Sequence, residues 1–238
     1  MGSTAAQHEL RLHDTDEAAL PESYERDGVV LMRDVLSAEE VAEVRGNIAR
    51  YAKWLLPALP EDWARREADG TLRGMYFLER VDPFFTDFAA RADLKDIVER
   101  VTGRTATFAS METFHKPARV GSPSLVHQDG VYYVGRPIVG VNLWLGLDDA
   151  TADNGALKYW IGSHHDGLVE HGGVEGDEFF RAIAPHLVAA MPDPFVAELS
   201  SGSGALHHDM MVHGSDGNAS ERPRLAMALT YTLEPATR

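Results

Sequence analysis

The segment RLAMALTY, residues 224–231, alternates between two kinds of side chain, and this pattern decides the fold. Along a β-strand, residues i and i+2 point to the same side. One face of this segment carries Arg224, Ala226, Ala228 and Thr230, and the other carries large apolar side chains. Because the first face is small apart from the arginine, it suits a barrel interior beside a bound ligand. The second face suits packing under helices.

Six further short segments have a strand-like composition and are separated by Gly, Pro, Asn or Asp. They are residues 108–114, 124–133, 139–147, 156–161, 195–199 and 205–212. Asp153-Asn154-Gly155 predicts a tight turn between two of them. Seven or more short strands after an N-terminal helical region indicate a double-sheet barrel of the jelly-roll type.

The predicted helices lie mainly before these strands. Ser37 to Glu40 has the Ser-x-x-Glu form of a capping box, and helical spacing follows over residues 41–55. Residues 83–90 and 92–101 predict more helix, and we also expect one at 178–190, among the strands. The expected fold class is mainly β with helices (α+β): a double-stranded β-helix (jelly-roll or cupin-like) core with an N-terminal helical layer packed on one sheet.

The length of 238 residues fits one domain, expected at residues 17–238 after a flexible N-terminal arm at 1–16. A formal net charge of −15 disfavours nucleic acid and acidic membranes as partners. The sequence has no run of eighteen apolar residues, and it has no cysteine, which fits a cytoplasmic location. We expect a small-molecule substrate, whereas the oligomeric state is not predicted.

The pair His127 and Asp129 predicts a metal site, although a His-x-Asp pair is weak evidence alone. Two other pairs occur, at residues 164–166 and 207–209. We interpret the first as a loop and the second as mainly structural, with a possible contact to the metal ligands. On a strand, His127 and Asp129 would face the same interior, and His213 follows the distant strand at 205–212. Two imidazoles and one carboxylate can occupy one face of an octahedral Fe(II).

Arg224 stands eleven residues after His213 and is expected to point inward. A charged side chain aimed into a barrel needs a partner of opposite charge. A bound carboxylate beside the metal would supply it.

Several ordered motifs resemble the phytanoyl-CoA dioxygenase family over roughly residues 111–231. They are HQD at 127–129, WLGLDDAT at 144–151, NGAL at 154–157, GSH at 162–164, and HGS at 213–215 followed by Asn218, Ser220 and Arg224. One departure is Ile161, where the family usually has proline. The resemblance implies an Fe(II)- and 2-oxoglutarate-dependent oxygenase on a double-stranded β-helix.

The resemblance also implies roles for individual residues. His127, Asp129 and His213 would bind iron, while Arg224 and Ser215 would hold the distal carboxylate of 2-oxoglutarate. Met111 and Trp144 would line the co-substrate pocket. No catalytic residue is expected beyond the metal centre. Candidate substrate residues are Arg119, Tyr132, Tyr133, Arg136 and Trp160, and residues 75–77 are either a lid or buried packing.

The expected reaction is hydroxylation of an unactivated C–H bond in a small metabolite, with 2-oxoglutarate and O2 converted to succinate and CO2. Desaturation, epoxidation or cyclisation would follow from the same chemistry. Halogenation is disfavoured, because related halogenases lack the carboxylate that Asp129 provides. Two other classes remain as alternatives: a zinc hydrolase using the same three ligands, and a non-catalytic jelly-roll binding module.

Overall fold

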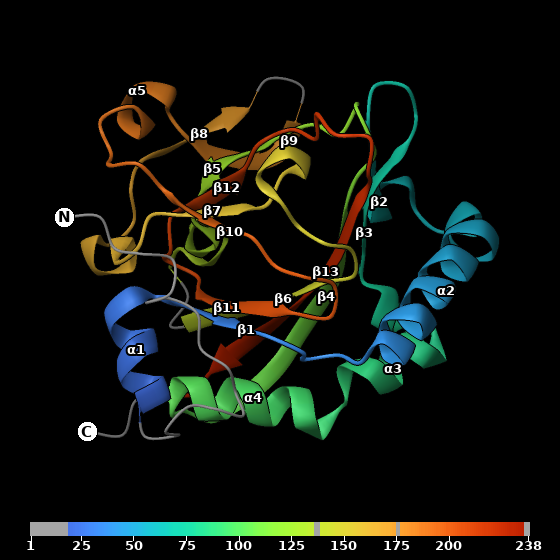
Figure 1. Ribbon diagram of the computed structural model, residues 1–238, viewed down its shortest axis with the longest axis horizontal. Helices are drawn as coiled ribbons and strands as arrows, with labels where there is room; N and C mark the ends of the chain where they lie inside the picture. The colour runs from blue at the N-terminus through green and yellow to red at the C-terminus, as the bar shows by residue number, and fades with distance from the viewer. Residues whose placement is uncertain (1–18, 136–138, 175–176, 236–238) are drawn as a thin grey trace.

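The computed structural model describes residues 19–135, 139–174 and 177–235 (Figure 1). The expected arm at residues 1–16 and the candidate substrate residue Arg136 lie outside the described residues.

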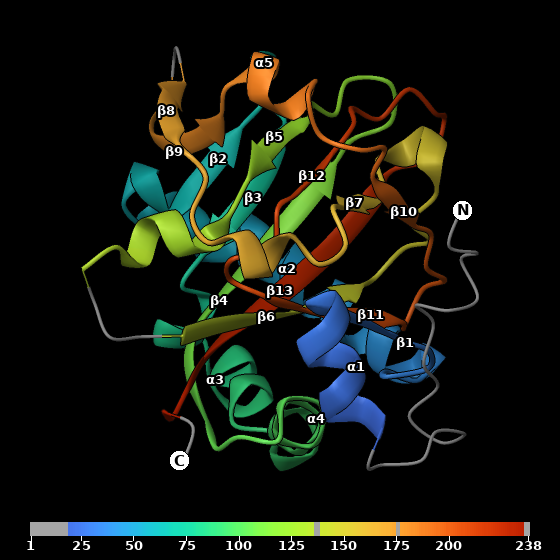
Figure 2. The same ribbon diagram turned by 90° about the vertical axis from the view of Figure 1, so that its left-hand side faces the viewer.

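Two antiparallel sheets form the core of the structure. The large sheet has the order β1 (Val29–Met32), β11 (Gly204–His208), β6 (Val139–Gly146), β13 (Arg224–Leu233), β4 (Ala106–Lys116), β3 (Leu72–Tyr76) and β2 (Ala64–Arg66). The small sheet has the order β10 (Phe195–Ala197), β7 (Leu157–Tyr159), β12 (His213–Ser215) and β5 (Ser124–His127). Figure 2 shows the small sheet lying over one face of the large sheet, which confirms the expected double-sheet architecture.

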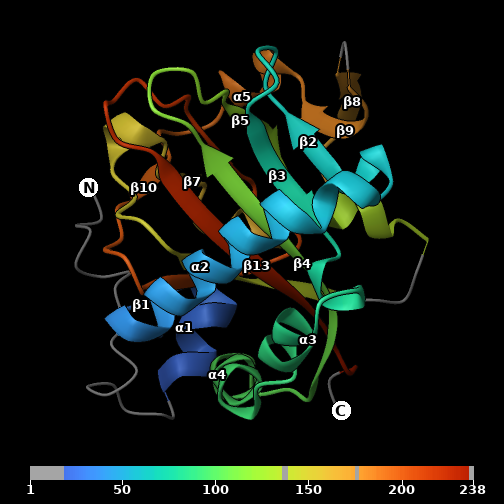
Figure 3. The ribbon, with the colours of Figure 1, turned by 90° about the vertical axis from the view of Figure 1, so that its right-hand side faces the viewer.

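Helices cover the other face of the large sheet, with α2 running across it (Figure 3). They are α1 (Ala19–Asp27), α2 (Ala38–Trp54), α3 (Pro83–Ala89) and α4 (Ala92–Thr102). The capping box predicted at the start of α2 is present, because Glu40 N donates to Ser37 Oγ at 3.2 Å and Ser37 N donates to Glu40 Oε2 at 2.8 Å. Among the described residues, no helix is long and apolar enough to cross a membrane.

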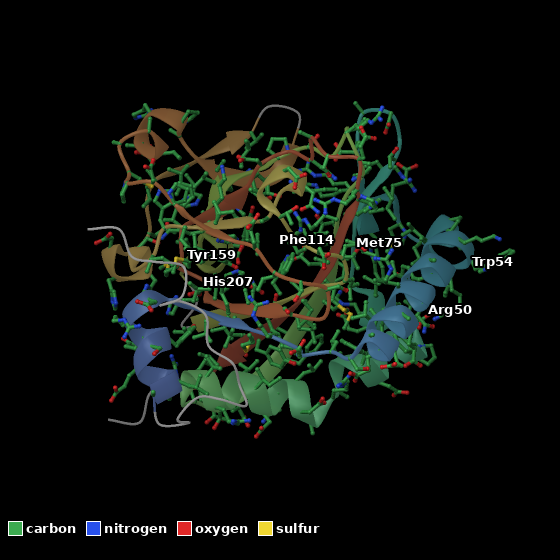
Figure 4. The ribbon with its side chains drawn as sticks, in the orientation of Figure 1. Arg50, Trp54, Met75, Phe114, Tyr159 and His207 are labelled. Carbon is green, nitrogen blue, oxygen red and sulfur yellow. The ribbon has the colours of Figure 1, made fainter. Side chains whose placement is uncertain are left out.

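The two faces of β13 belong to different apolar clusters, as its alternation predicts. Met227, Leu229 and Tyr231 lie in the outer cluster, between the large sheet and the helices. Ala226 and Ala228 lie in the inner cluster, between the two sheets. Figure 4 shows α2 at the edge of the molecule, with Trp54 pointing away from the sheet. The inner face of β13 is therefore built from small residues, as the sequence predicts.

The helix predicted at residues 178–190 is wrong. This segment forms the strand β9 (Asp177–Ile183), paired with β8 (His171–Val174), followed by the short helix α5 (Pro185–Val188). Pro185 has no backbone N–H and begins a new element, so the segment predicted as one helix is divided into two elements. Pairing with β8 then decides the conformation of the first half.

Two other local expectations need correction. The strand predicted at residues 124–133 ends at His127 and continues as the 3-10 helix η5 (Asp129–Tyr133). The hairpin of β2 and β3 was not expected, and it includes part of the suggested lid. Met75 on β3 is buried in the outer cluster (Figure 4), so it serves packing and is not part of a lid.

Candidate metal centre and co-substrate site

Three side chains from two strand ends meet between the sheets. His127 ends β5, Asp129 starts η5, and His213 starts β12 directly opposite His127 in the sheet register. One ligand atom from each lies within 4.8 Å of the other two, and in the described part of the chain this is the only such group of His, Cys, Asp or Glu. Asp129 Oδ1 is 3.4 Å from His127 Nε2. The arrangement can hold one metal ion with two imidazoles and one carboxylate.

The backbone fixes the orientation of both histidines. His127 Nδ1 lies 2.8 Å from the carbonyl oxygen of Leu125, and His213 Nδ1 lies 2.9 Å from that of Met211. Each Nδ1 therefore carries the proton and donates it to the carbonyl, which leaves Nε2 as a free lone pair facing the centre. Burial and the neighbouring His127 lower the pKa of His213 to about 3. It is neutral at physiological pH, as a metal ligand must be.

Asp129 is oriented by polar neighbours on the large sheet. The side-chain amide of Asn142 donates to Asp129 Oδ2, and Thr230 Oγ1 donates to Asn142 Oδ1 at 2.6 Å. His207 Nε2 also lies 3.4 Å from Oδ2. Because both contacts use Oδ2, the second oxygen, Oδ1, is left for a metal. Such partners of a ligating carboxylate raise metal affinity.

His207 has a larger role at this centre than the mainly structural one that its sequence predicts. It is only 3% exposed, and its Nδ1 lies 3.1 Å from the hydroxyl of Tyr159 (Figure 4). The Tyr159 hydroxyl can donate to Nδ1, which places the ring proton on Nε2, facing Asp129. His207 and Asn142 are direct partners in the β11–β6 register. Since cross-strand partners lie on the same face of a sheet, the pairing of His207 with Asn142 is the feature from which its position beside Asp129 could have been inferred.

Arg224 and Ser215 are both buried, and each has a polar atom without a partner in the described part of the chain. They are 2% and 4% exposed, and Arg224 Nε and Ser215 Oγ have no hydrogen-bond partner among the described residues. The Arg224 guanidinium lies 5.5 Å from the ring of Trp144. Burial lowers the pKa of Arg224 to about 10, so it remains charged at neutral pH. A buried guanidinium whose Nε lacks a partner among the described residues fits a ligand carboxylate.

A second buried cation, Lys116, lies beside Arg224 and strengthens this conclusion. The two residues are partners across β4 and β13, and Lys116 is 4% exposed. Its ammonium donates to Ser122 O at 2.6 Å. Burial and then the charge of Arg224 lower the pKa of Lys116 to about 7. The local field therefore favours an anionic ligand.

The expectation that Met111 lines the co-substrate pocket is wrong. Met111 pairs with Leu229, and both lie in the outer cluster under the helices. Trp144 pairs with Ala228 and lies in the inner cluster, beside Arg224, as the resemblance implies. The residue of β4 that faces the interior is the next one, Glu112, because neighbouring residues of a strand face opposite sides.

The candidate substrate residues fall into two groups. Tyr132 and Tyr133 lie on η5, directly after Asp129; Tyr132 is 44% exposed, and its hydroxyl accepts a hydrogen bond from Arg181 N at 3.1 Å. Arg119 instead pairs with Glu221 at the surface, with Nε 2.6 Å from Oε2. Trp160 packs in a third cluster, and its indole donates to Pro192 O at 2.8 Å. The tyrosines therefore stay candidates, whereas the contacts of Arg119 and Trp160 are structural.

Comparison with known proteins agrees with this geometry. The family model described as Phytanoyl-CoA dioxygenase (PhyH) matches residues 24–226. A phytanoyl-CoA dioxygenase of Arabidopsis thaliana is 29% identical over 64% of this chain and 53% of its own length, so the chain spans about half of that relative. An L-proline trans-4-hydroxylase of Streptomyces griseoviridis is 24% identical over 87% of this chain and 83% of its own.

The fold has close counterparts among solved structures. EvdO2 from Micromonospora carbonacea var. aurantiaca, complexed with 2-oxoglutarate, superimposes with a TM-score of 0.74 at 21% identity, over 94% of both chains. The family match covers most of the described residues and includes His127, Asp129, His213 and Arg224. The chain belongs to the phytanoyl-CoA dioxygenase family.

Proposed function

We propose that this protein is an Fe(II)- and 2-oxoglutarate-dependent oxygenase that hydroxylates an unactivated C–H bond of a small molecule. The observation that carries the proposal is the combination of two sites. A His127, Asp129 and His213 group can hold the metal, and the buried Arg224, whose Nε has no hydrogen-bond partner in the described part of the chain, can hold a carboxylate. A zinc hydrolase needs only the first of these sites. The named relatives, a dioxygenase and a hydroxylase, support the same reaction class.

The chain's own residues bind, orient and shield the reactants. When bound, Fe(II) and 2-oxoglutarate supply the oxidising chemistry with O2, giving succinate and CO2. The Nε2 atoms of His127 and His213 and Oδ1 of Asp129 face the metal position. Arg224 and Ser215 would bind the far carboxylate of 2-oxoglutarate, with the ring of Trp144 lying 5.5 Å from the guanidinium.

The decisive experiment measures succinate formation from 2-oxoglutarate by the purified protein, with Fe(II) and with Zn(II), in air and under argon. We expect succinate only with Fe(II) and O2, and product mass increased by one oxygen atom once a substrate is supplied. Hydrolytic activity with Zn(II) under argon would establish the zinc alternative. A product two mass units lighter than its substrate would show desaturation or cyclisation.

A pair of histidine variants separates a metal centre from an accidental cluster. His213→Ala should abolish stoichiometric Fe(II) binding, measured by calorimetry under argon, because one of three ligands is lost. The matched control is His165→Ala, since His165 belongs to another His-x-Asp motif and lies exposed in η7 (Ser163–Asp166). Metal binding that survives in His213→Ala would leave the non-catalytic binding module as the better explanation.

A further inference from the structure

Glu112 projects from the inner face of β4 toward the space between the sheets. In the register it faces Ala228 of β13 and Tyr76 of β3. It therefore shares a face with Phe114, two residues further on, which packs against the inner cluster and lies between the sheets in Figure 4. The cross-strand partner of Glu112, Ala228, has only a small side chain.

The carboxylate of Glu112 lies within the electrostatic reach of the metal centre. Burial and then the negative charge of Asp129 raise the pKa of Glu112 to about 7, while the charges of His127 and Arg65 lower it. The charges of both ligand residues therefore act on the Glu112 carboxyl group. Glu112 is not part of the group whose atoms could bind one metal ion.

Glu112 has no protein partner in the described ranges. It forms no hydrogen bond or ion pair there, although it is half-buried. Glutamates away from solvent are normally paired, since an isolated carboxylate loses hydration without compensation. A half-buried, partly accessible carboxylate beside a metal centre is therefore available to a ligand.

Aromatic side chains lie at the metal centre and across the strand from Glu112, which pairs with Tyr76 in the β3–β4 register. Phe180 lies edge-on to His127, with ring centroids 4.9 Å apart. The guanidinium of Arg65 lies 5.5 Å from the same Phe180 ring. Arg65 is thus engaged by its own neighbours. Aromatic rings next to a carboxylate make a favourable environment for an organic cation.

We propose that Glu112 binds a protonated nitrogen of the substrate, an amine or a guanidine, and so holds the neighbouring C–H bond toward the metal position. This inference rests on the proposed function and narrows its substrate class to cationic or zwitterionic small molecules. It assigns Glu112 a role in substrate selection, distinct from the residues that bind the metal and the co-substrate.

The test uses the Fe(II)- and 2-oxoglutarate-loaded protein and pairs of probes that differ only in the charged nitrogen. Suitable pairs are L-proline with tetrahydrofuran-2-carboxylate, butylammonium with butanol, and phenethylammonium with phenethyl alcohol. Binding is measured by calorimetry under argon, and stimulated succinate formation is measured in air. We expect the charged member of at least one pair to bind about tenfold tighter or more.

Variants of Glu112 should change this preference in a graded way. Glu112→Gln should reduce the preference for the charged member to about threefold or less, because the carboxylate charge is lost. Glu112→Asp keeps the charge and should retain part of the preference. Glu79→Gln is the matched control, since Glu79 is also a half-buried glutamate with its pKa raised by burial, but it lies in η4 (Leu78–Arg80) before α3. It should leave the preference unchanged.

The outcomes separate this inference from the proposed function. Equal binding of both members of every pair, no binding of any cation, or an unchanged preference in a folded Glu112→Gln would each overturn the role of Glu112. If Glu112→Gln does not fold, the wild-type and Glu112→Asp preferences decide. Fe(II)- and O2-dependent succinate formation would persist in all these cases. Its absence from the wild-type protein would instead refute the proposed function.

Discussion

The two faces of the large sheet are formed by the same strands, but one face packs against the helices and the other faces the candidate site. The outer face of β13 presents Met227, Leu229 and Tyr231 to the helices, and these residues are fully packed. The inner face presents Arg224, which has an unsatisfied Nε, and β4 adds Glu112, which has no partner among the described residues. One face is optimised for stability, and the other retains polar groups whose partners are ligands. The comparison predicts that substitutions on the two faces will affect different measurements.

Arg224→Met should give the largest difference between the effect on ligand affinity and the effect on stability. Affinity for 2-oxoglutarate should fall by about 100-fold or more, because losing one member of a buried charge pair costs about 2–5 kcal/mol. The free energy of unfolding without ligand should not fall, since an unpaired buried charge is removed. Calorimetry with 2-oxoglutarate and urea unfolding measure the two effects.

Arg222→Met is the matched control for Arg224→Met. Arg222 lies two residues earlier and forms an exposed ion pair with Asp153. It should keep its co-substrate affinity. A ligand-free Arg224→Met protein that unfolds much more easily than the wild type would show that the inner arginine is a structural residue.

On the outer face, Leu229→Ala should reduce stability and leave ligand affinity nearly unchanged. Leu229 is 0% exposed, and truncating a buried leucine costs about 2–5 kcal/mol in free energy of unfolding. The dissociation constants of the folded protein for Fe(II) and 2-oxoglutarate should stay within about twofold. Leu168→Ala, at a position that is 40% exposed, should change neither quantity. Loss of ligand affinity without loss of stability would contradict the division between the faces.

A smaller effect is expected at Asn142, which contacts the metal ligand Asp129 and not the metal position. Asn142→Ala should weaken Fe(II) binding by about 10–100-fold, because the groups that orient a metal ligand contribute about that much. Calorimetry with Fe(II) under argon measures it, with Asn47→Ala on the exposed side of α2 as the control. Unchanged Fe(II) affinity would mean that His207 alone orients the carboxylate.

The smallest effect concerns the pH dependence of stability. The folded-state pKa of Lys116 is about 7, against 10.5 for an unperturbed lysine, so between these values the unfolded chain binds more protons. Stability should therefore rise with pH in this window, by at most about 1.4 kcal/mol per pH unit. Lys116→Met should flatten this rise in urea unfolding between pH 7.5 and 10, and the exposed Lys53→Met should not. Identical slopes in wild type and Lys116→Met would refute the depressed pKa.

The sequence predicted the features that depend on alternation and on rare chemistry. The alternation of β13 predicted both of its faces, because a strand places every second residue on one side. His127, Asp129 and His213 could be identified as metal ligands because the His-x-Asp pair is combined with a distant histidine and an arginine. Family resemblance then supplied Ser215 and Trp144. The structure places these residues between the sheets.

The failures share a physical cause, which is dependence on pairing between distant segments. The composition of residues 178–190 favours a helix, but β8 recruits the first half as a strand. Met111 was predicted at the pocket, and the inward residue is its neighbour Glu112, because an error of one residue exchanges the two faces of a strand. His207 could be recognised only from its partner Asn142 across the sheet.

The hydrogen bonds of the two metal-facing histidines have a consequence for how such a protein can diversify. Each ring is oriented by the carbonyl group two residues before it in the chain, Leu125 for His127 and Met211 for His213. The side chains of Leu125 and Met211 do not make these bonds, so the orientation of the histidine rings does not depend on which side chains stand at those positions. Residues such as Glu112 and Tyr132 can then change while the ligand geometry stays constant. One reactive centre can thus be inherited unchanged while the choice of substrate evolves around it.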